Sequence, residues 1–184
     1  MNENNLKTKK FINFGPSSRA VAQPMDHSLL DNFFEHLTME RFANVQYFSI
    51  YLWFQERDLN GFASYFLNES KGEMEHAQKF ADYLIARGQR VKLNELPEPV
   101  QTWDSIENLI SYSLSIEADL TSSLEQLYSI SERISDTRTN VFLDPIIDAQ
   151  TKSENEFANI LGKVKFASNQ PSAILLIDSD LKKK

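Results

Sequence analysis

The sequence predicts an all-α protein: a four-helix bundle with a long crossover between its second and third helices and a short fifth helix. Three observations favour this fold. Apolar residues recur with helical spacing over four long segments. The 184 residues include only 5 Gly and 6 Pro, so few positions break regular structure. An aperiodic stretch, 89–103, separates the first pair of helical segments from the second.

The first two predicted helices form an antiparallel pair. One spans about 27–57, with Asp26 as its N-cap. A short turn at 58–61 leads to the second helix, which spans about 61–87. Gly88 follows its C-cap and is predicted to end it. The apolar residues of the first helix follow the spacing of one helix face: Leu30, Phe33, Phe34, Leu37, Phe42 and Val45.

The stretch 89–103 predicts the crossover, because it contains Pro97 and Pro99 and lacks a helical period. A connection of this length lets the third helix run parallel to the second. Asp104 or Ser105 is the predicted cap of that third helix, which continues to about residue 135.

The fourth predicted helix spans about 137–168 after a tight turn. Pro145 lies inside it, so we expect a kink there, or a 3₁₀ start before it, because proline removes one backbone donor. Pro171 begins the short fifth helix, which ends near residue 181.

The N-terminal segment, residues 1–25, is predicted to be an extended arm before a single helical domain at 26–184. It lacks periodicity and contains Gly15 and Pro16. Its basic residues are not followed by an apolar core, which excludes a secretory signal. We favour a surface-lying or disordered arm, and a transit peptide is the alternative.

Composition excludes several classes of function. The chain has no Cys, and therefore no disulfide, thiolate metal site or cysteine nucleophile. Its net charge of −7 disfavours nucleic acid as a partner and suits cations such as metal ions. No apolar run is long enough to cross a membrane. We expect a cytoplasmic protein, or a plastid protein if the source is eukaryotic.

Five polar residues form a candidate metal site. Each of the four long predicted helices contributes one of them, and the second helix adds a histidine. Glu73 and His76 are three residues apart, so they leave the same face of the second helix. Glu40, Glu117 and Gln150 come from the first, third and fourth helices. Thirty-three residues separate Glu40 from Glu73 and also Glu117 from Gln150. The equal spacing predicts that both antiparallel pairs place these residues at similar depth.

The chemistry of this set favours iron or manganese over structural zinc, because carboxylate oxygens outnumber the single imidazole. Glu73 is the best candidate to bridge two metals. Two Fe(II) ions held together can supply two electrons to one O2. Tyr47 lies two helical turns after Glu40, where its phenol could hydrogen-bond a ligand or give up an electron; an ordinary core role is the alternative. His27 and His36 receive no role.

The ordered motifs resemble those of the non-haem ferritins over residues 26–182. They are Glu40-Arg-Phe-Ala-Asn-Val-Gln-Tyr47, Glu73-Met-Glu-His76, Ile116-Glu117-Ala118 and Gln150-x-x-Ser153. The segments 136–139 and 142–145 look most like cyanobacterial-type members. The resemblance implies a ferritin-like domain, a hollow 24-subunit shell that stores ferric oxide, and a ferroxidase centre.

The resemblance also implies the roles of individual residues. Glu40, Glu73 and His76 would hold the first iron, Glu73 would bridge, and Glu117 would hold the second. Gln150 would lie near the second iron or the oxygen site, and Tyr47 beside the centre.

The chain departs from the bacterial pattern in ways that make the centre resemble the animal heavy-chain type. Gly72 stands where many members carry a second acid. Ala149, Lys152 and Ser153 occupy the region where members with a third iron site carry more acids, so a third site is not expected. Met74 stands near the position of the haem-ligating methionine of bacterioferritins, but non-haem members often carry Met there, so no haem is expected.

The resemblance further implies pores near the start of the fourth helix, where Asp136 and Asp144 are the available acids. Three copies of Asp144 would attract Fe(II) by their charge. The alternative for Asp144 is an N-cap ahead of Pro145. Glu69, one turn before Glu73, could lie on the inner route from pore to centre.

We therefore expect an iron-storage ferroxidase that uses O2 or peroxide. The alternative is a passive iron-storage or structural bundle without fast ferroxidase activity. A DNA-protecting mini-ferritin of twelve subunits is disfavoured, because a fifth helix and ligands within the bundle do not fit that pattern.

Overall fold

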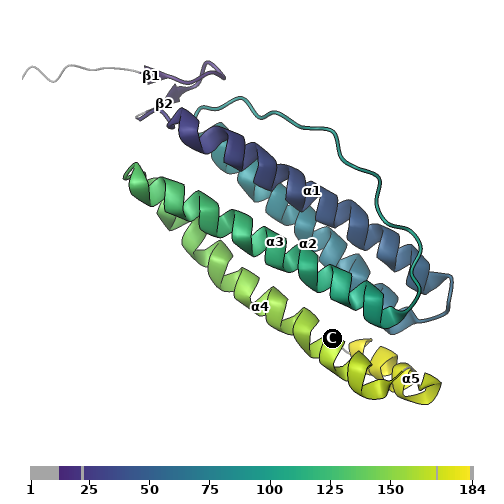
Figure 1. Ribbon diagram of the computed structural model, residues 1–184. Coiled ribbons are helices and arrows are strands. Elements are labelled where there is room, and N and C mark those ends of the chain that lie inside the picture. Colours follow the sequence, from purple (N-terminus) through teal and green to yellow (C-terminus); the bar gives the residue numbers. More distant parts are fainter. Residues whose placement is uncertain (1–12, 22, 169, 183–184) are drawn as a thin grey trace, which may run out of the picture.

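The computed structural model describes residues 13–21, 23–168 and 170–182. Four long helices form the body of the molecule and a short fifth follows at one end (Figure 1). They are α1 His27–Gln55, α2 Asn60–Ala86, α3 Ile106–Arg133, α4 Thr137–Ala167 and α5 Pro171–Leu181. The predicted all-α bundle with a short C-terminal helix is confirmed. None of these helices combines the length and apolarity needed to span a membrane.

The connection between α2 and α3 runs the length of α1, so α3 starts at the opposite end of the bundle from the end of α2 (Figure 1). Side chains of α1 hold it there. Gln46 Nε2 donates to the Val100 carbonyl at 2.9 Å, and the Val100 N–H donates to Gln46 Oε1 at 2.8 Å. Arg41 donates to the Asn94 carbonyl at 2.9 Å. The predicted crossover is confirmed, and with it the parallel course of α2 and α3.

The helix ends follow the predicted capping chemistry. Asp26 accepts from the Ser28 N–H at 2.8 Å, and Ser105, rather than Asp104, accepts from the Asn108 N–H at 3.1 Å. Gly88 has a positive φ of 75°, which residues with a Cβ rarely adopt. These caps satisfy backbone groups that a helix leaves without partners.

Pro145 lies within an uninterrupted α4, so the 3₁₀ start that we considered is absent. The α-helix is continuous over Thr137–Ala167, and no 3₁₀ start precedes the proline in this stretch. The missing N–H costs one hydrogen bond to the Val141 carbonyl. Both Val141 and Pro145 are exposed, so water can satisfy that carbonyl and the helix tolerates the loss.

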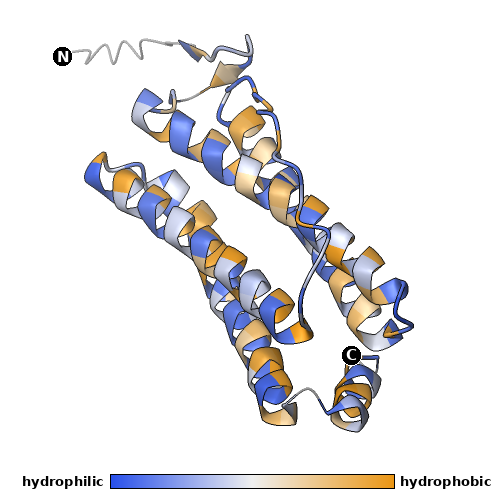
Figure 2. Cartoon of the chain, turned by 45° about the vertical axis from the view of Figure 1, so that its right-hand side comes forward, coloured by the Kyte–Doolittle hydropathy of each residue, from blue (hydrophilic) through white to orange (hydrophobic). Residues whose placement is uncertain are grey.

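Two apolar clusters fill the bundle, one toward each end. The first contains Ile50, Phe54, Phe66 and Phe157, and the second contains Phe33, Phe80 and Leu127. Figure 2 shows hydrophobic and hydrophilic residues interspersed along each of the helices. Along α1 the second cluster ends at Leu37 and the first begins at Ala43, which leaves a layer at residue 40 between them.

Part of the predicted N-terminal arm is a small β-hairpin. Strands β1 (Asn13–Phe14) and β2 (Ala20–Val21) pair antiparallel. The Ser17 N–H and hydroxyl both donate to the Gly88 carbonyl, at 3.2 and 2.9 Å. A Cβ on Gly15 would lie 2.1 Å from that carbonyl oxygen, so only glycine fits. The hairpin is therefore seated on the end of α2. Residues 1–12 of the predicted arm lie outside the described residues.

Candidate metal centre

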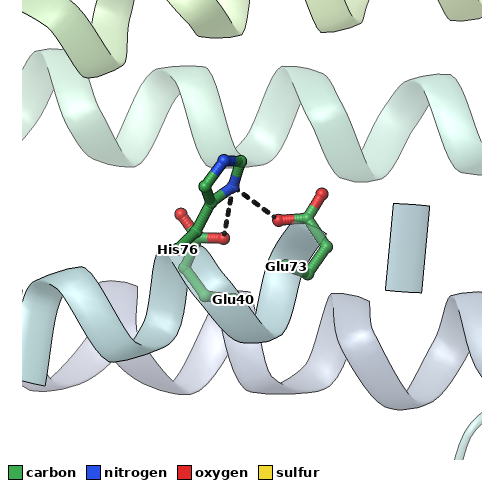
Figure 3. Close-up of side chains that lie close together, drawn as sticks. All are labelled: Glu40, Glu73 and His76. Atoms are coloured by element: carbon green, nitrogen blue, oxygen red, sulfur yellow. Dashed lines mark hydrogen bonds and ion pairs between the residues drawn. The ribbon is translucent and has the colours of Figure 1, made fainter. Parts of the chain in front are cut away.

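Three predicted ligands meet in the polar layer between the two apolar clusters. Glu40 comes from α1, and Glu73 and His76 from α2, and their ligand atoms all lie within 4.8 Å of one another (Figure 3). His76 Nδ1 is 3.0 Å from Glu73 Oε2 and 3.6 Å from Glu40 Oε2. The three-residue spacing on α2 places Glu73 and His76 on one face, as predicted.

The two carboxylates of this cluster are buried, His76 is half-buried, and one carboxylate oxygen lacks a hydrogen-bond partner among the described residues. Glu40 is 1% exposed and Glu73 4% exposed. Glu40 Oε2 has no hydrogen-bond partner within the described part of the chain. A buried carboxylate oxygen without a partner is costly, and a cation is the natural way to satisfy it. The donor set of two carboxylates and one imidazole therefore fits a divalent metal.

The protonation of the cluster reflects the competition between burial and charge. Burial raises the pKa of Glu73 well above its usual range, and the neighbouring carboxylates of Glu40 and Glu117 raise it further. Burial acts to raise the pKa of Glu40, but the hydrogen bond with His36 and the proximity of His76, 3.6 Å away, outweigh it and lower that pKa. Glu40 and Glu73 raise the pKa of His76 to about 10. Because the pKa values of Glu73 and His76 are raised, metal binding at these two residues competes with protons.

Glu117 on α3 is a further predicted ligand. It is 1% exposed, and both of its carboxylate oxygens accept hydrogen bonds. The Tyr47 hydroxyl donates to Oε1, and Gln150 Nε2 donates to Oε2 at 2.7 Å. Gln150 also donates to the Glu117 backbone carbonyl at 3.2 Å. The structure therefore gathers Glu117, Tyr47 and Gln150 from three different helices.

Glu117 lies within electrostatic reach of the group formed by Glu40, Glu73 and His76. Burial raises the pKa of Glu117 and hydrogen bonds from Tyr47 and Gln150 oppose it, while the charges of Glu40 and His76 also act on it. Glu117 is nevertheless outside the compact group of Glu40, Glu73 and His76. The predicted ligands are therefore arranged asymmetrically: Glu40, Glu73 and His76 form one compact group, and Glu117 is a single carboxylate outside it.

Sequence reasoning missed His36. This side chain is fully buried, and its Nε2 lies 2.9 Å from Glu40 Oε1. Its Nδ1 lies 3.0 Å from the hydroxyl of Ser123 on α3. The available signal was the four-residue spacing from Glu40, which puts both residues on one helix face.

The predicted pore residues occupy three different settings. Asp136 is buried and caps α4, and its carboxylate accepts two hydrogen bonds from Arg87, at 3.1 and 2.9 Å. This arrangement favours a structural role for Asp136 over iron passage. Asp144 is exposed and lines a groove of about 440 Å³ together with Glu125. Glu69 is half-buried, and its charge acts on Tyr47.

A cavity of about 240 Å³ adjoins the centre. His76 and Gln150 line its inner side, and the remaining lining residues are Lys79, Phe142, Pro145, Ile146 and Ala149. Most of these are apolar, so the cavity suits a small neutral molecule better than a hydrated cation.

The sequence matches known proteins over most of its length. The family model described as a ferritin-like domain matches residues 31–167. The ferritin-1 heavy chain of Schistosoma mansoni is 30% identical over 135 residues, which cover 69% of this chain and 78% of that protein. The bacterial non-heme ferritin of Staphylococcus haemolyticus is 24% identical over 157 residues, which cover 85% of this chain and 95% of that protein.

Solved structures share the fold. The open pore ferritin of Archaeoglobus fulgidus superposes with a TM-score of 0.84 at 24% identity, covering 87% of this chain and 98% of that one. An iron-soaked variant of PmFTN superposes with a TM-score of 0.79 at 32% identity, and the match covers 83% of this chain and 98% of that one.

Proposed function

This chain belongs to the ferritin family, and from that premise we propose that it stores iron and oxidises Fe(II) at a two-iron centre inside each subunit. The observation that carries the proposal is the compact group of Glu40, Glu73 and His76, in which both carboxylates are buried and Glu40 Oε2 has no hydrogen-bond partner among the described residues. Family membership supports iron storage and ferroxidase activity in general. The polar layer supports the position that we propose for iron oxidation within the subunit.

In this proposal iron is the substrate. Two Fe(II) ions each give up one electron, and O2 takes both electrons with two protons to form H2O2. If peroxide is the oxidant, the same two electrons and two protons convert it to two water molecules. The apolar cavity beside His76 suits either small neutral oxidant.

Each residue then has a distinct task. Glu40 and His76 hold the first Fe(II), Glu73 bridges, and Glu117 holds the second. Anionic oxygens favour Fe(III) over Fe(II), so these carboxylates assist the oxidation. Tyr47 and Gln150 hold the Glu117 carboxylate in place by donating one hydrogen bond to each of its oxygens.

The second position has few ligands, which suits iron that passes through the centre and leaves as Fe(III). We further propose that the subunits assemble into a 24-subunit shell that holds the mineral. Asp144 is the better candidate of the two predicted pore acids, because its side chain is exposed while Asp136 is bound to Arg87.

The test is stopped-flow oxidation of Fe(II) by Glu73→Ala, with Glu75→Ala as the matched control. Glu75 is two residues away and exposed, so the same change is made outside the centre. We expect Glu73→Ala to lose rapid oxidation while still forming a shell of wild-type size. Glu75→Ala should oxidise Fe(II) at the wild-type rate. Wild-type oxidation by Glu73→Ala would overturn the assignment.

Stoichiometry separates this proposal from passive storage or a structural bundle. Fast oxidation that saturates at two Fe(II) per subunit supports the two-iron centre. Slow uptake without saturation would support the passive alternative.

A further inference from the structure

We propose that His36 is a positioning residue, which binds one oxygen of Glu40 and leaves only the other oxygen free for metal. This inference rests on the proposed function, because it concerns the first iron position. It assigns a task to a buried histidine that lies outside the compact ligand group.

The two oxygens of Glu40 have different surroundings. Oε1 lies 2.9 Å from His36 Nε2, which is hydrogen-bond distance. Oε2 lies 3.6 Å from His76 Nδ1 and has no hydrogen-bond partner among the described residues. The free oxygen is thus the one that joins Glu73 and His76 in the cluster. Glu40 is set to bind metal through Oε2 alone.

The imidazole of His36 is itself held at its other nitrogen. Nδ1 lies 3.0 Å from the Ser123 hydroxyl. With the ring proton on Nε2, Nε2–H donates to Glu40 and the Ser123 O–H donates to Nδ1. Both ring nitrogens and the Ser123 hydroxyl then have hydrogen-bond partners. The opposite tautomer would place a nitrogen lone pair against the carboxylate. Glu40 and Ser123 together therefore select one tautomer and one ring orientation.

Packing removes the remaining freedom of the ring. His36 is fully buried, and its ring lies against Phe80, with 4.4 Å between ring centroids and an interplanar angle of 49°. Phe80 belongs to α2 and Ser123 to α3, so three helices fix the side chain. Because both ring nitrogens are already engaged, His36 is suited to orient Glu40 rather than to bind metal itself.

A carboxylate held in this way loses little freedom when metal binds, and its free oxygen already faces the other ligands. Partners that hydrogen-bond to a metal ligand commonly change metal affinity by about 10- to 100-fold when they are removed. Loss of the imidazole would free the Glu40 carboxylate to rotate or to bind metal through both oxygens.

The test is calorimetric titration of the intact protein with Zn(II), which needs no oxidation. Glu40→Ala identifies the heat that belongs to the first position. His36→Phe keeps an aromatic ring but removes both nitrogens, and we expect about tenfold weaker Zn(II) binding at that position. His36→Gln restores a donor and should recover most of the affinity. His27→Phe makes the same change at an exposed histidine of α1 and should bind Zn(II) as wild type does.

The outcomes separate three cases. Lower unfolding temperature of His36→Phe with unchanged Zn(II) affinity means a purely structural role and overturns the inference. If wild type and Glu40→Ala bind Zn(II) equally, the two-iron centre itself fails. If His36→Phe does not fold, a crystal structure of the Zn(II)-loaded wild type decides. Coordination by one Glu40 oxygen while the other stays bound to His36 Nε2 supports the inference, and coordination by both oxygens or loss of the His36 contact overturns it.

Discussion

The Tyr47 hydroxyl of α1 donates a hydrogen bond to Glu117 of α3, across the buried polar layer of the bundle. Tyr47 is fully buried, and burial together with the charges of Glu117 and Glu73 raises its pKa well above the usual range. The phenol therefore keeps its proton and acts as a donor. The contact joins the two helical pairs at the level of the candidate metal centre.

Tyr47→Phe is expected to weaken metal binding at the Glu117 position by about tenfold, because the carboxylate loses one of its two side-chain donors. Calorimetric titration with Zn(II) measures this, since the first position should keep its affinity. Tyr65→Phe is the matched control: Tyr65 is also buried, and its hydroxyl has no partner within the described ranges. Equal effects of the two substitutions would contradict the proposed role of Tyr47.

Gln150→Glu is expected to make the second metal dissociate about tenfold more slowly. The substitution places a second carboxylate 2.7 Å from Glu117 Oε2, where two negative charges repel each other until a metal neutralises them. Gln150→Leu, which removes the donor without adding charge, should release metal faster than wild type. Chelator-driven release of Zn(II) from loaded protein measures both rates, and identical rates for the two variants would refute the explanation.

The helices and the grouping of Glu40, Glu73 and His76 could be predicted because local rules determine them. Apolar spacing placed four long helices, and the shared separation of 33 residues placed Glu40, Glu73, Glu117 and Gln150 at one level. Glu73 and His76 needed only the geometry of a single helix turn.

The features that sequence reasoning missed depend on distant partners. The spacing of four residues from Glu40 was the one local signal for His36, because its other partner, Ser123, lies 87 residues away. Arg87 lies 49 residues before Asp136, and their pairing emerges only when α2 and α4 meet. The hairpin at 13–21 has two-residue strands, too short for an alternating pattern, and its glycine is explained by contact with Gly88.

Arg87→Ala is expected to cost about 3 kcal/mol of unfolding free energy, because it leaves the buried Asp136 carboxylate without its cation. The double variant Arg87→Met, Asp136→Leu should be more stable than Arg87→Ala, since it removes both charges. Guanidinium unfolding measures each free energy. A double variant less stable than Arg87→Ala would show that the charged pair itself, rather than the orphaned carboxylate, dominates.

The contribution of this pair is expected to depend on pH. Burial alone would raise the pKa of Asp136, but hydrogen bonds and charge from Arg87 lower it below its ordinary value. A carboxyl whose pKa is lower when folded stabilises the protein at pH above its unfolded pKa, and this stabilisation is lost as pH falls through the folded pKa. The difference in unfolding free energy between wild type and Asp136→Asn should therefore be constant near neutral pH and shrink below about pH 4.

Asp144→Asn is expected to slow iron uptake at low Fe(II) concentration and low salt, where attraction by negative charge matters most. Asp148→Asn is the control, because Asp148 is one turn further along α4, exposed, and paired with Lys152 at 2.6 Å. Uptake should approach the wild-type rate at high salt. Equal slowing by both substitutions would mean that net charge, rather than the place of Asp144, controls uptake.

Asp178→Ala is expected to loosen α5 from the bundle. The N-cap residue of α2, Leu59, makes no side-chain capping bond, and Asp178 of α5 takes its place. Its Oδ1 accepts from the N–H groups of Gly61 and Phe62 at 2.8 and 2.9 Å. Loss of a cap costs about 1 kcal/mol, so the variant should still fold. Hydrogen exchange should become faster at 61–63 and over α5, whereas Asp178→Asn, which keeps an accepting oxygen, should stay close to wild type.

Gly61→Ala offers an independent check, because its Cβ would lie 1.7 Å from the Asp178 carbonyl oxygen and must displace α5. Unchanged exchange over α5 in both Asp178→Ala and Gly61→Ala would show that other contacts hold the fifth helix.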